Sequence, residues 1–216
     1  MKEFGRIFLD HWYIMFPIAL CSAAGFAVVV ERALTLRAAS AVDKDELMGF
    51  IQSYCMQGHV QKAISVVSQS KGPLSNIVRA GLISVANGQS VEEVQTAMDA
   101  VALREIPRLG RRIDTLSALA NVAVLLGLLG TVSGMIAAFG AVATLPPADK
   151  ARVLASSIAE ALNATGFGLL VSIILFAAWG WLSGWSTKVI DDVHEASVST
   201  LNFILSNKAK VFKDPK

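Results

Sequence analysis

The sequence predicts an all-α integral membrane protein with three transmembrane helices and long cytoplasmic helical extensions. Of its 216 residues, 54% are hydrophobic and only 17% are charged, whereas a soluble domain carries about 25% charged residues. The shortage of charge is concentrated in three apolar runs, each long enough for a helix to cross a bilayer. The segments between them carry helix signals and no strand pattern or phosphate-binding loop.

The first apolar run, residues 12–30, follows a short segment, residues 1–11, that is expected on the outer side. Its 19 uncharged residues would span about 28 Å at about 1.5 Å per residue. Trp12 and Tyr13 suit the membrane interface. A signal peptide is the competing interpretation, but the apolar run continues beyond Ser22-Ala23-Ala24, the only segment resembling a cleavage site.

The polar body, residues 31–114, is predicted to form a cytoplasmic helical domain. Starts of helices are indicated at Asp43, Pro73 and Ser90, and ends at Gly58 and Asn87-Gly88. From Val91 the sequence predicts one helix that projects into the second span, residues 115–145, and is kinked but not ended by Pro107.

The remaining chain is predicted to form a turn, a third span that returns alongside the second, and a tail. Residues 146–155 are expected to form a tight turn on the outer side, in which Asp149 caps the next helix. The third span is assigned to residues 156–187. Residues 188–216 are expected to form a cytoplasmic tail that is helical to about Lys208.

The second span has one face made almost entirely of small residues. At 100° per residue, this face combines glycine and alanine with a single hydroxyl, that of Thr131. Its packing residues are Gly127, Gly130, Gly134 and Ala138, with Gly168 of the third span. The opposite face carries Leu125, Leu128, Leu129, Val132 and Ile136. Because small residues let membrane helices approach closely, this face is expected to form the inner wall of a membrane assembly, where it packs helices or lines a narrow pore.

Lysine and arginine near the ends of the spans predict the orientation. The polar body and tail carry eight: Arg32, Arg37, Lys44, Arg104, Arg108, Arg111, Arg112 and Lys188. The opposite side carries four: Lys2, Arg6, Lys150 and Arg152. Positive charge favours the cytoplasmic side, so we expect a multi-pass membrane protein with its amino terminus outside and its polar body and carboxyl terminus in the cytoplasm. The basic stripe Arg104, Arg108, Arg111 and Arg112 is interpreted as an anchor at the lipid headgroups, with a docking site for a partner as the alternative.

Candidate ion-pathway residues lie in the second and third spans. Glu160 is the only acidic residue bordering the third apolar run, and charges inside a membrane cost at least about 2.5–3.5 kcal/mol and usually mark ion routes. The alternative is an interfacial carboxylate that reaches water. Thr131, Thr165, Asn163 and Ser172 add polar groups, although a membrane threonine commonly bonds to a carbonyl of its own helix.

Other chemistry has little support in the sequence. Cys21 and Cys55 are expected to be reduced thiols, and His59 stands without nearby metal ligands. The spans contain no Ser/His pair, paired Asp or metal-ligand cluster, so we expect neither an enzyme nor a cofactor.

Two motifs resemble the paired signature of the MotA/TolQ/ExbB proton channel family. They are Gly127-Leu-Leu-Gly-Thr-Val-Ser-Gly-Met-Ile136 and Ala159-Glu-Ala-Leu-Asn-Ala-Thr-Gly-Phe-Gly-Leu169. The order of elements resembles the three-span ExbB/TolQ branch, whereas MotA has four spans. The chain departs from the pattern at Ile174, Ser133 and Asn163, where relatives often have Pro, Trp and an apolar residue.

The resemblance implies a ring of subunits, five in known relatives, around two copies of a single-span partner of the ExbD, TolR or MotB type. It implies that Thr131 and Thr165 face a protonatable Asp in the partner's membrane helix, with Glu160 near the mouth of the path. The implied function is a channel or stator subunit of a motor that proton-motive force drives and that transmits force to the periplasm or outer membrane. The resemblance also implies the bacterial inner membrane, with a periplasmic amino terminus and a cytoplasmic carboxyl terminus. It implies H⁺ as the transported ion, with Na⁺ as the alternative. Uptake, envelope maintenance, secretion and gliding motility all remain open as the powered process. A structural membrane scaffold without ion conduction is the alternative.

Overall fold

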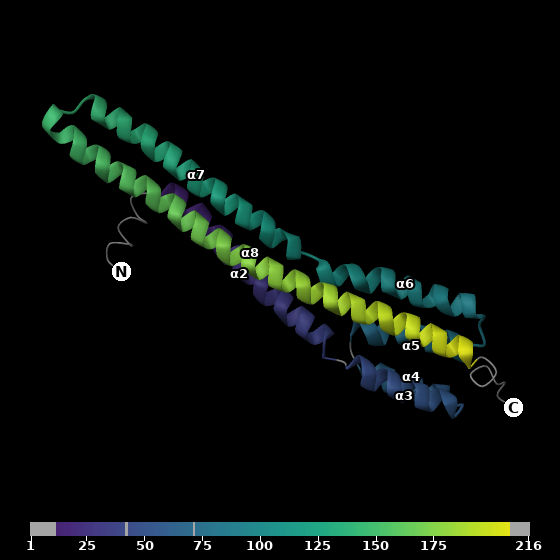
Figure 1. Ribbon diagram of the computed structural model, residues 1–216. Helices are drawn as coiled ribbons and strands as arrows, with labels where there is room; N and C mark the ends of the chain where they lie inside the picture. Colours follow the sequence, from purple (N-terminus) through teal and green to yellow (C-terminus); the bar gives the residue numbers. More distant parts are fainter. Residues whose placement is uncertain (1–11, 42, 71, 208–216) are drawn as a thin grey trace. The chain divides into compact units, whose positions relative to one another are not determined.

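The computed structural model describes residues 12–41, 43–70 and 72–207, and every secondary-structure element in these ranges is an α-helix (Figure 1). Three helical segments are long and apolar enough to cross a membrane, within Ile14–Met56, Val91–Ala143 and Pro147–Ser206. The predicted all-α class with three membrane-crossing helices is confirmed. The expected outer segment, residues 1–11 with Lys2 and Arg6, and the end of the tail, residues 208–216, lie outside the described residues.

The chain divides into two compact units. Unit 1 is drawn from Met1–Glu31 and Arg112–Leu182, and unit 2 from Arg32–Arg111 and Ser183–Lys216. Helix α2 (Trp12–Ala39) and helix α8 (Pro147–Ser206) each contribute residues to both units. Unit 1 contains the small-residue face of the second span, and unit 2 contains most of the polar body together with the tail.

Unit 2 contains four further helices, whose boundaries follow local sequence signals. They are α3 (Lys44–Met56), α4 (Val60–Gln69), α5 (Pro73–Ala86) and α6 (Val91–Gly110). The Asp43 side chain accepts hydrogen bonds from the backbone at the start of α3, and Ser90 forms a reciprocal capping box with Glu93 at the start of α6. Gly58 and Gly88 follow α3 and α5 with φ of 77° and 71°, a left-handed conformation that glycine adopts without steric cost. These predicted boundaries are confirmed.

The core of unit 2 is built from large side chains. Fully buried members include Ile51, Val67, Ile77, Leu82 and Val94. The carboxyl-terminal part of α8 completes this core through the buried residues Val193, Ala196 and Ile204. Burying such aliphatic side chains removes apolar surface from water, which is the main stabilising contribution in a polar solvent.

Two polar groups of unit 2 report on its packing. Cys55 is fully buried, and this burial raises the pKa of its thiol from 9.0 to about 11. At the surface, the Lys44 ammonium lies 2.6 Å from a carboxylate oxygen of Glu195, and this hydrogen bond raises the pKa of Lys44. The contact joins the start of α3 to α8.

In unit 1, α7 (Ile113–Ala143) and α8 run antiparallel and are joined by the short turn Thr144–Pro146 (Figure 1). The expected turn over residues 146–155 is wrong, because α8 already begins at Pro147. Proline suits this first helical position, where no intrahelical N–H bond is lost. Asp149 therefore lies in the first turn of α8 and is not its capping residue.

The expected continuous helix from Val91 through the second span is also wrong. Helix α6 continues past Pro107 and ends at Gly110, and α7 begins at Ile113. The break lies at Arg111 and Arg112, where Arg112 has a φ of 64°, a conformation that costs a non-glycine residue strain. Arg112 donates to both carboxylate oxygens of Glu31 on α2, at 3.0 and 3.2 Å, so a contact distant in sequence accompanies this backbone conformation.

Candidate functional site

The small-residue face of α7 is the surface on which α7 and α8 pack against each other within one chain. A Cβ atom added at Gly168 would lie 2.6 Å from the Ala123 carbonyl oxygen and 3.0 Å from the Gly127 Cα atom. At Gly130 and Gly134 an added Cβ would lie 2.7 and 2.8 Å from methyl groups of α8. The two backbones approach so closely that no side chain fits between them, as in other membrane helix pairs rich in small residues.

This geometry bears on the two uses of the small-residue face, helix packing and pore lining, that the sequence leaves open. Gly127, Gly130, Gly134 and Ala138 are buried against neighbouring helices of the same chain, so they are not free to line a pore. Lipid offers no hydrophobic driving force between helices, and close packing has to hold the hairpin together. The opposite, leucine-rich face of α7 is exposed, with Leu125 at 62% and Ile136 at 69%.

Thr131 and Thr165 lie together at one edge of this packed face. The Thr165 hydroxyl donates to the Gly127 carbonyl of α7 at 2.7 Å, and its oxygen lies 3.4 Å from that of Thr131. Thr131 donates to the Leu128 carbonyl of its own helix at 2.8 Å, which is the intrahelical bonding expected of a membrane threonine. Both side chains are half-buried, so the pair forms a polar contact at the rim of the helix interface.

Helix α2 covers the other edge of the same face. On a helical wheel, Gly130 and Thr131 lie on opposite sides of Gly127, at about 60° and 40°. Ile14 of α2 lies beside Gly130, so α2 occupies the edge opposite the threonine pair. Ile14 is itself buried, as are Met15 and Ile18 of the same helix. The edge carrying Thr131 and Thr165 remains partly exposed within one chain.

The structure does not gather the other candidate ion-pathway residues around the threonines. Glu160 and Asn163 are exposed, and the angle between Glu160 and Thr165 around α8, about 140°, places them on different edges. Ala164, which sequence spacing assigns to the same face as Glu160, is buried beneath Gly130. Ser172 shares the side of Thr165 but is itself only 3% exposed, so within one chain it lies behind the surface. Within one chain, therefore, these residues do not form one continuous surface with the threonine pair, and their place in an ion path stays a prediction.

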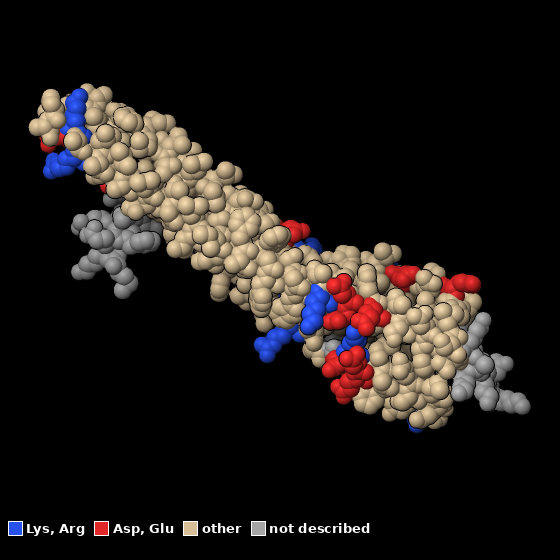
Figure 2. Space-filling view, in the orientation of Figure 1, with Lys and Arg blue, Asp and Glu red and all other residues tan. Residues whose placement is uncertain are grey.

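Charged residues are sparse along the α7 and α8 hairpin. No Asp, Glu, Lys or Arg occurs from Thr115 to Ala148, and Glu160 is the only one from Val153 to Thr187. Figure 2 shows the middle of the hairpin free of charged side chains on the face in view. Such a surface suits the hydrocarbon region of a bilayer. Among the described residues, no group of three or more potential ligands could hold a metal ion.

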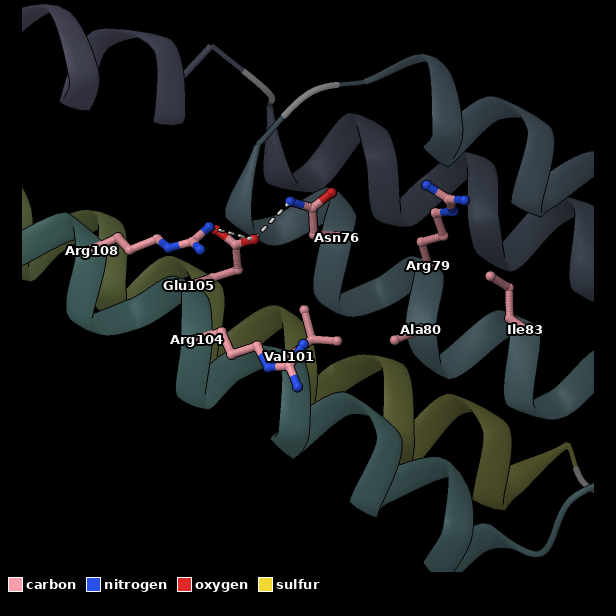
Figure 3. Close-up of a pocket in the computed structure, with 8 residues that line it drawn as sticks. All are labelled: Asn76, Arg79, Ala80, Ile83, Val101, Arg104, Glu105 and Arg108. Atoms are coloured by element: carbon pink, nitrogen blue, oxygen red, sulfur yellow. Dashed lines mark hydrogen bonds and ion pairs between the residues drawn. The ribbon is translucent and has the colours of Figure 1, made fainter.

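The basic stripe is divided by the helix break. Arg104 and Arg108 of α6 line a cavity of about 370 Å³ with Arg79 of α5, and Glu105 lies between Asn76 and Arg108 (Figure 3). The Asn76 amide donates to Glu105 at 3.1 Å, and Arg108 lies 3.7 Å from the same carboxylate. Arg111 is exposed, whereas Arg112 pairs with Glu31 in unit 1. Three of the four arginines therefore belong to unit 2, and Arg112 belongs to unit 1.

One contact of unit 1 was not anticipated from the sequence. The Trp179 indole N–H on α8 donates to Asp114 Oδ1 in the first turn of α7, at 3.3 Å. Trp179 follows Thr165 by two intervals of seven residues, with Ser172 between them. Asp114 and Asn121 of α7 are also separated by seven residues. This seven-residue spacing was the available signal, because it keeps residues on one side of a supercoiled helix pair.

The fold and this hairpin define a class of protein: a multi-pass membrane protein in which two spans pack through glycine and pair threonines at one edge. The sequence profile of the MotA/TolQ/ExbB proton channel family matches residues 69–195, and the chain belongs to this family. It is 31% identical to an ExbB-type biopolymer transport homolog of Methanothermobacter thermautotrophicus over 87% of this chain and 66% of that protein.

Further comparisons agree with this membership. The chain is 25% identical to biopolymer transport protein exbB1 of Vibrio cholerae, over 87% of this chain and 81% of that protein. It is 37% identical to the Tol-Pal system protein TolQ of Haemophilus influenzae, over 43% of this chain and 40% of that protein. A chain in the structure of C. jejuni MotAB has the same fold, with a TM-score of 0.64 and 16% identity, covering 94% of this chain and 84% of that one.

Proposed function

We propose that the chain is the ring-forming channel subunit of a motor driven by proton-motive force. In this proposal several copies, five as in known relatives, surround a single-span partner of the ExbD, TolR or MotB type with a protonatable Asp in its membrane helix. The edge bearing Thr131 and Thr165 faces that partner. Proton passage changes the charge of the partner's Asp and thereby its contacts with the ring, and the resulting movement transmits force to the periplasm or outer membrane.

The observation that carries this proposal is the threonine pair at the edge left open by α2. A hydroxyl that served only to close its own helix would bond to a carbonyl of that helix. Thr165 instead bonds across to the Gly127 carbonyl and lies against Thr131, so polar atoms of two spans meet at one partly exposed site. One elementary charge crossing 100 mV yields about 2.3 kcal/mol, and a polar lining lowers the barrier to its transfer.

The experiment is proton flux in proteoliposomes that contain the chain co-purified with a single-span partner. Thr165→Val removes the hydroxyl and is expected to abolish flux, while the lost interhelical bond costs only about 0.6 kcal/mol, so assembly is retained. Thr165→Ser, which keeps the hydroxyl, is the matched variant and is expected to conduct. Ser133→Ala removes a hydroxyl that bonds to Gly130 within α7 and is expected to leave flux unchanged.

The competing function is a structural scaffold, which the glycine packing of α7 and α8 would serve equally well. A scaffold predicts no flux above that of empty vesicles, or flux that is the same in wild type and Thr165→Val. Flux that disappears when the partner's membrane Asp is changed to Asn favours the motor. Native mass spectrometry of the same preparation counts the copies of this chain.

A further inference from the structure

We propose that Asp114, together with Trp179, forms the port through which protons leave the threonine site at the amino-terminal end of α7. This inference rests on the proposed function and assigns it an additional residue. Its starting point is the hydrogen bond from Trp179 Nε1 to Asp114 Oδ1 at 3.3 Å, which closes the hairpin at the end opposite the Thr144–Pro146 turn. Both residues belong to unit 1.

The port lies on the same edge of the hairpin as the threonines. Thr165 of α8 contacts Gly127 of α7, and Trp179 of α8 contacts Asp114 of α7. Between the two contacts the chain advances fourteen residues along α8 and goes back thirteen residues along the antiparallel α7. The two helices therefore keep their register over this distance, and the residues between these contacts stay on one side. Asn121, seven residues from Asp114, is exposed on that side, and Ser117 is half-buried there. Polar groups therefore lie towards both ends of this edge, the threonine pair at one end and Asn121, Ser117 and Asp114 at the other, with the exposed Leu128 between them.

Asp114 is the only carboxylate along this edge, and therefore the only side chain there that can bind a proton and release it again. Threonine and serine hydroxyls and the Asn121 amide can bind water, but they do not hold an added proton. Asp114 is the only carboxylate of α7, and along α8 the first carboxylate beyond Thr165 is Asp191. The distance from Thr131 to Asp114 is about 25 Å at about 1.5 Å per residue, so water has to connect them.

The surroundings of Asp114 leave its carboxylate available for exchange. Arg111 and Arg112 precede it, but Arg112 is held by Glu31 of α2 at 3.0 Å, and Asp114 makes no ion pair with any described residue. The Trp179 N–H binds one carboxylate oxygen, and the residue as a whole is exposed. In each passage a hydrated proton from the threonine side binds the carboxylate, and the same proton then leaves to bulk water, so the carboxylate is restored.

A purely structural role for Asp114 would be the electrostatic stabilisation of the α7 amino terminus. The two roles differ in their pH dependence. A transfer group should limit flux according to the proton concentration on its own side of the membrane, whereas a helix-stabilising group should change only the amount of assembled complex. Measurement of flux per assembled complex against the pH on the side of Asp114 separates them.

The experiment uses the full chain with its single-span partner in proteoliposomes. Asp114→Asn is expected to reduce flux by about a hundredfold, the lower range for loss of a proton-transfer group, and to change how flux depends on the pH at that side. Asp114→Glu keeps a carboxylate and should conduct with a shifted pH profile. Trp179→Phe keeps the ring but removes the donor, and should shift the profile with less loss of flux. Asp99→Asn alters an exposed carboxylate of α6 and should match wild type.

The outcomes distinguish a failure of the proposed port from a failure of the proposed channel function on which it rests. If Asp114→Asn and Asp114→Glu both conduct with the wild-type pH profile while Thr165→Val blocks flux, the proposed role of Asp114 is wrong and the proposed channel function is supported. If Thr165→Val conducts like wild type, the proposed channel itself is wrong. If Asp114→Asn does not assemble, the pH profile of Asp114→Glu decides: an unchanged profile overturns the port, and a shifted one supports it.

Discussion

The interiors of the two units are stabilised by different kinds of packing. In unit 2, side chains as large as Leu82 and Ile77 are fully buried. These side chains fill the space between the helices and keep their backbones apart. In unit 1, Gly127 and Gly168 bring two backbones into contact, and the large side chains, such as Leu129, lie on the outside. The difference follows the solvent: water drives large apolar groups inward, whereas lipid accepts them and leaves close backbone packing as the source of stability.

The largest expected effect is in the side-chain core of unit 2. Leu82→Ala should destabilise this unit by about 2–5 kcal/mol, because it leaves a cavity among fully buried neighbours. Leu103→Ala is the matched control, since this leucine of α6 is 77% exposed, and it should change stability by less than about 0.5 kcal/mol. Urea unfolding in detergent, followed by hydrogen exchange of α5, measures both. Equal effects of the two variants would show that α5 and α6 are not packed as described.

A second prediction concerns the exclusion of water from the same core. Burial raises the pKa of Cys55 from 9.0 to about 11, so its thiolate fraction at pH 8 should be about a hundredfold below that of an exposed thiol. Iodoacetamide should therefore modify Cys55 far more slowly than a cysteine introduced by Gln57→Cys at the exposed end of the same helix. Equal rates would contradict a dry core.

The same shift gives the pH dependence of unit 2. Because the folded state holds the Cys55 proton more tightly than the unfolded state, this thiol contributes stability that is fully present below pH 9. The contribution is lost as the pH rises through about 11. Cys55→Ala should abolish that part of the alkaline destabilisation, which a denaturation series between these pH values would reveal.

The smallest expected effect on stability tests the backbone packing of unit 1. Gly168→Ala places a methyl group against the Ala123 carbonyl and should cost about 1–3 kcal/mol as the helices move apart. Gly166→Ala is the matched control on the same helix, because nothing lies within 4 Å of a Cβ added there, and Ala should be neutral or slightly favourable by helix propensity. Thermal unfolding in detergent, read by size-exclusion chromatography, compares the two. If Gly166→Ala lowered the thermal stability as much as Gly168→Ala, the argument for close contact between α7 and α8 would fail.

The fold was predictable where local chemistry sets it. The Ser90 capping box and Gly88 set helix boundaries through groups that are only a few residues apart. The apolar runs predict the three spans by their length and composition. The break at Arg112 was not predictable, because its left-handed backbone has no glycine to signal it and is tied to Glu31, which is distant in sequence. The prediction that Pro107 does not end its helix is confirmed, because α6 continues through it to Gly110.

The candidate site was predictable in its residues and not in its arrangement. Motif spacing identifies Thr131 and Thr165, but helical angles within one span cannot show which edge of a hairpin a third helix covers. The position of α2 beside Gly130 decides that the threonine edge stays open. Glu160 and Ser172 illustrate the same limit, because one is exposed and the other is buried although both belong to the polar set of α8.

The most direct measurement of the central claim is the accessibility of neighbouring positions on α7 to a water-soluble thiol reagent. In a Cys21→Ala and Cys55→Ala background, Thr131→Cys and Leu129→Cys are compared in the assembled complex within membranes. If the threonine edge borders an ion path and the leucine face meets lipid, the reagent modifies the cysteine at position 131 and spares the one at 129. Modification at position 129 with protection at 131 would contradict the account.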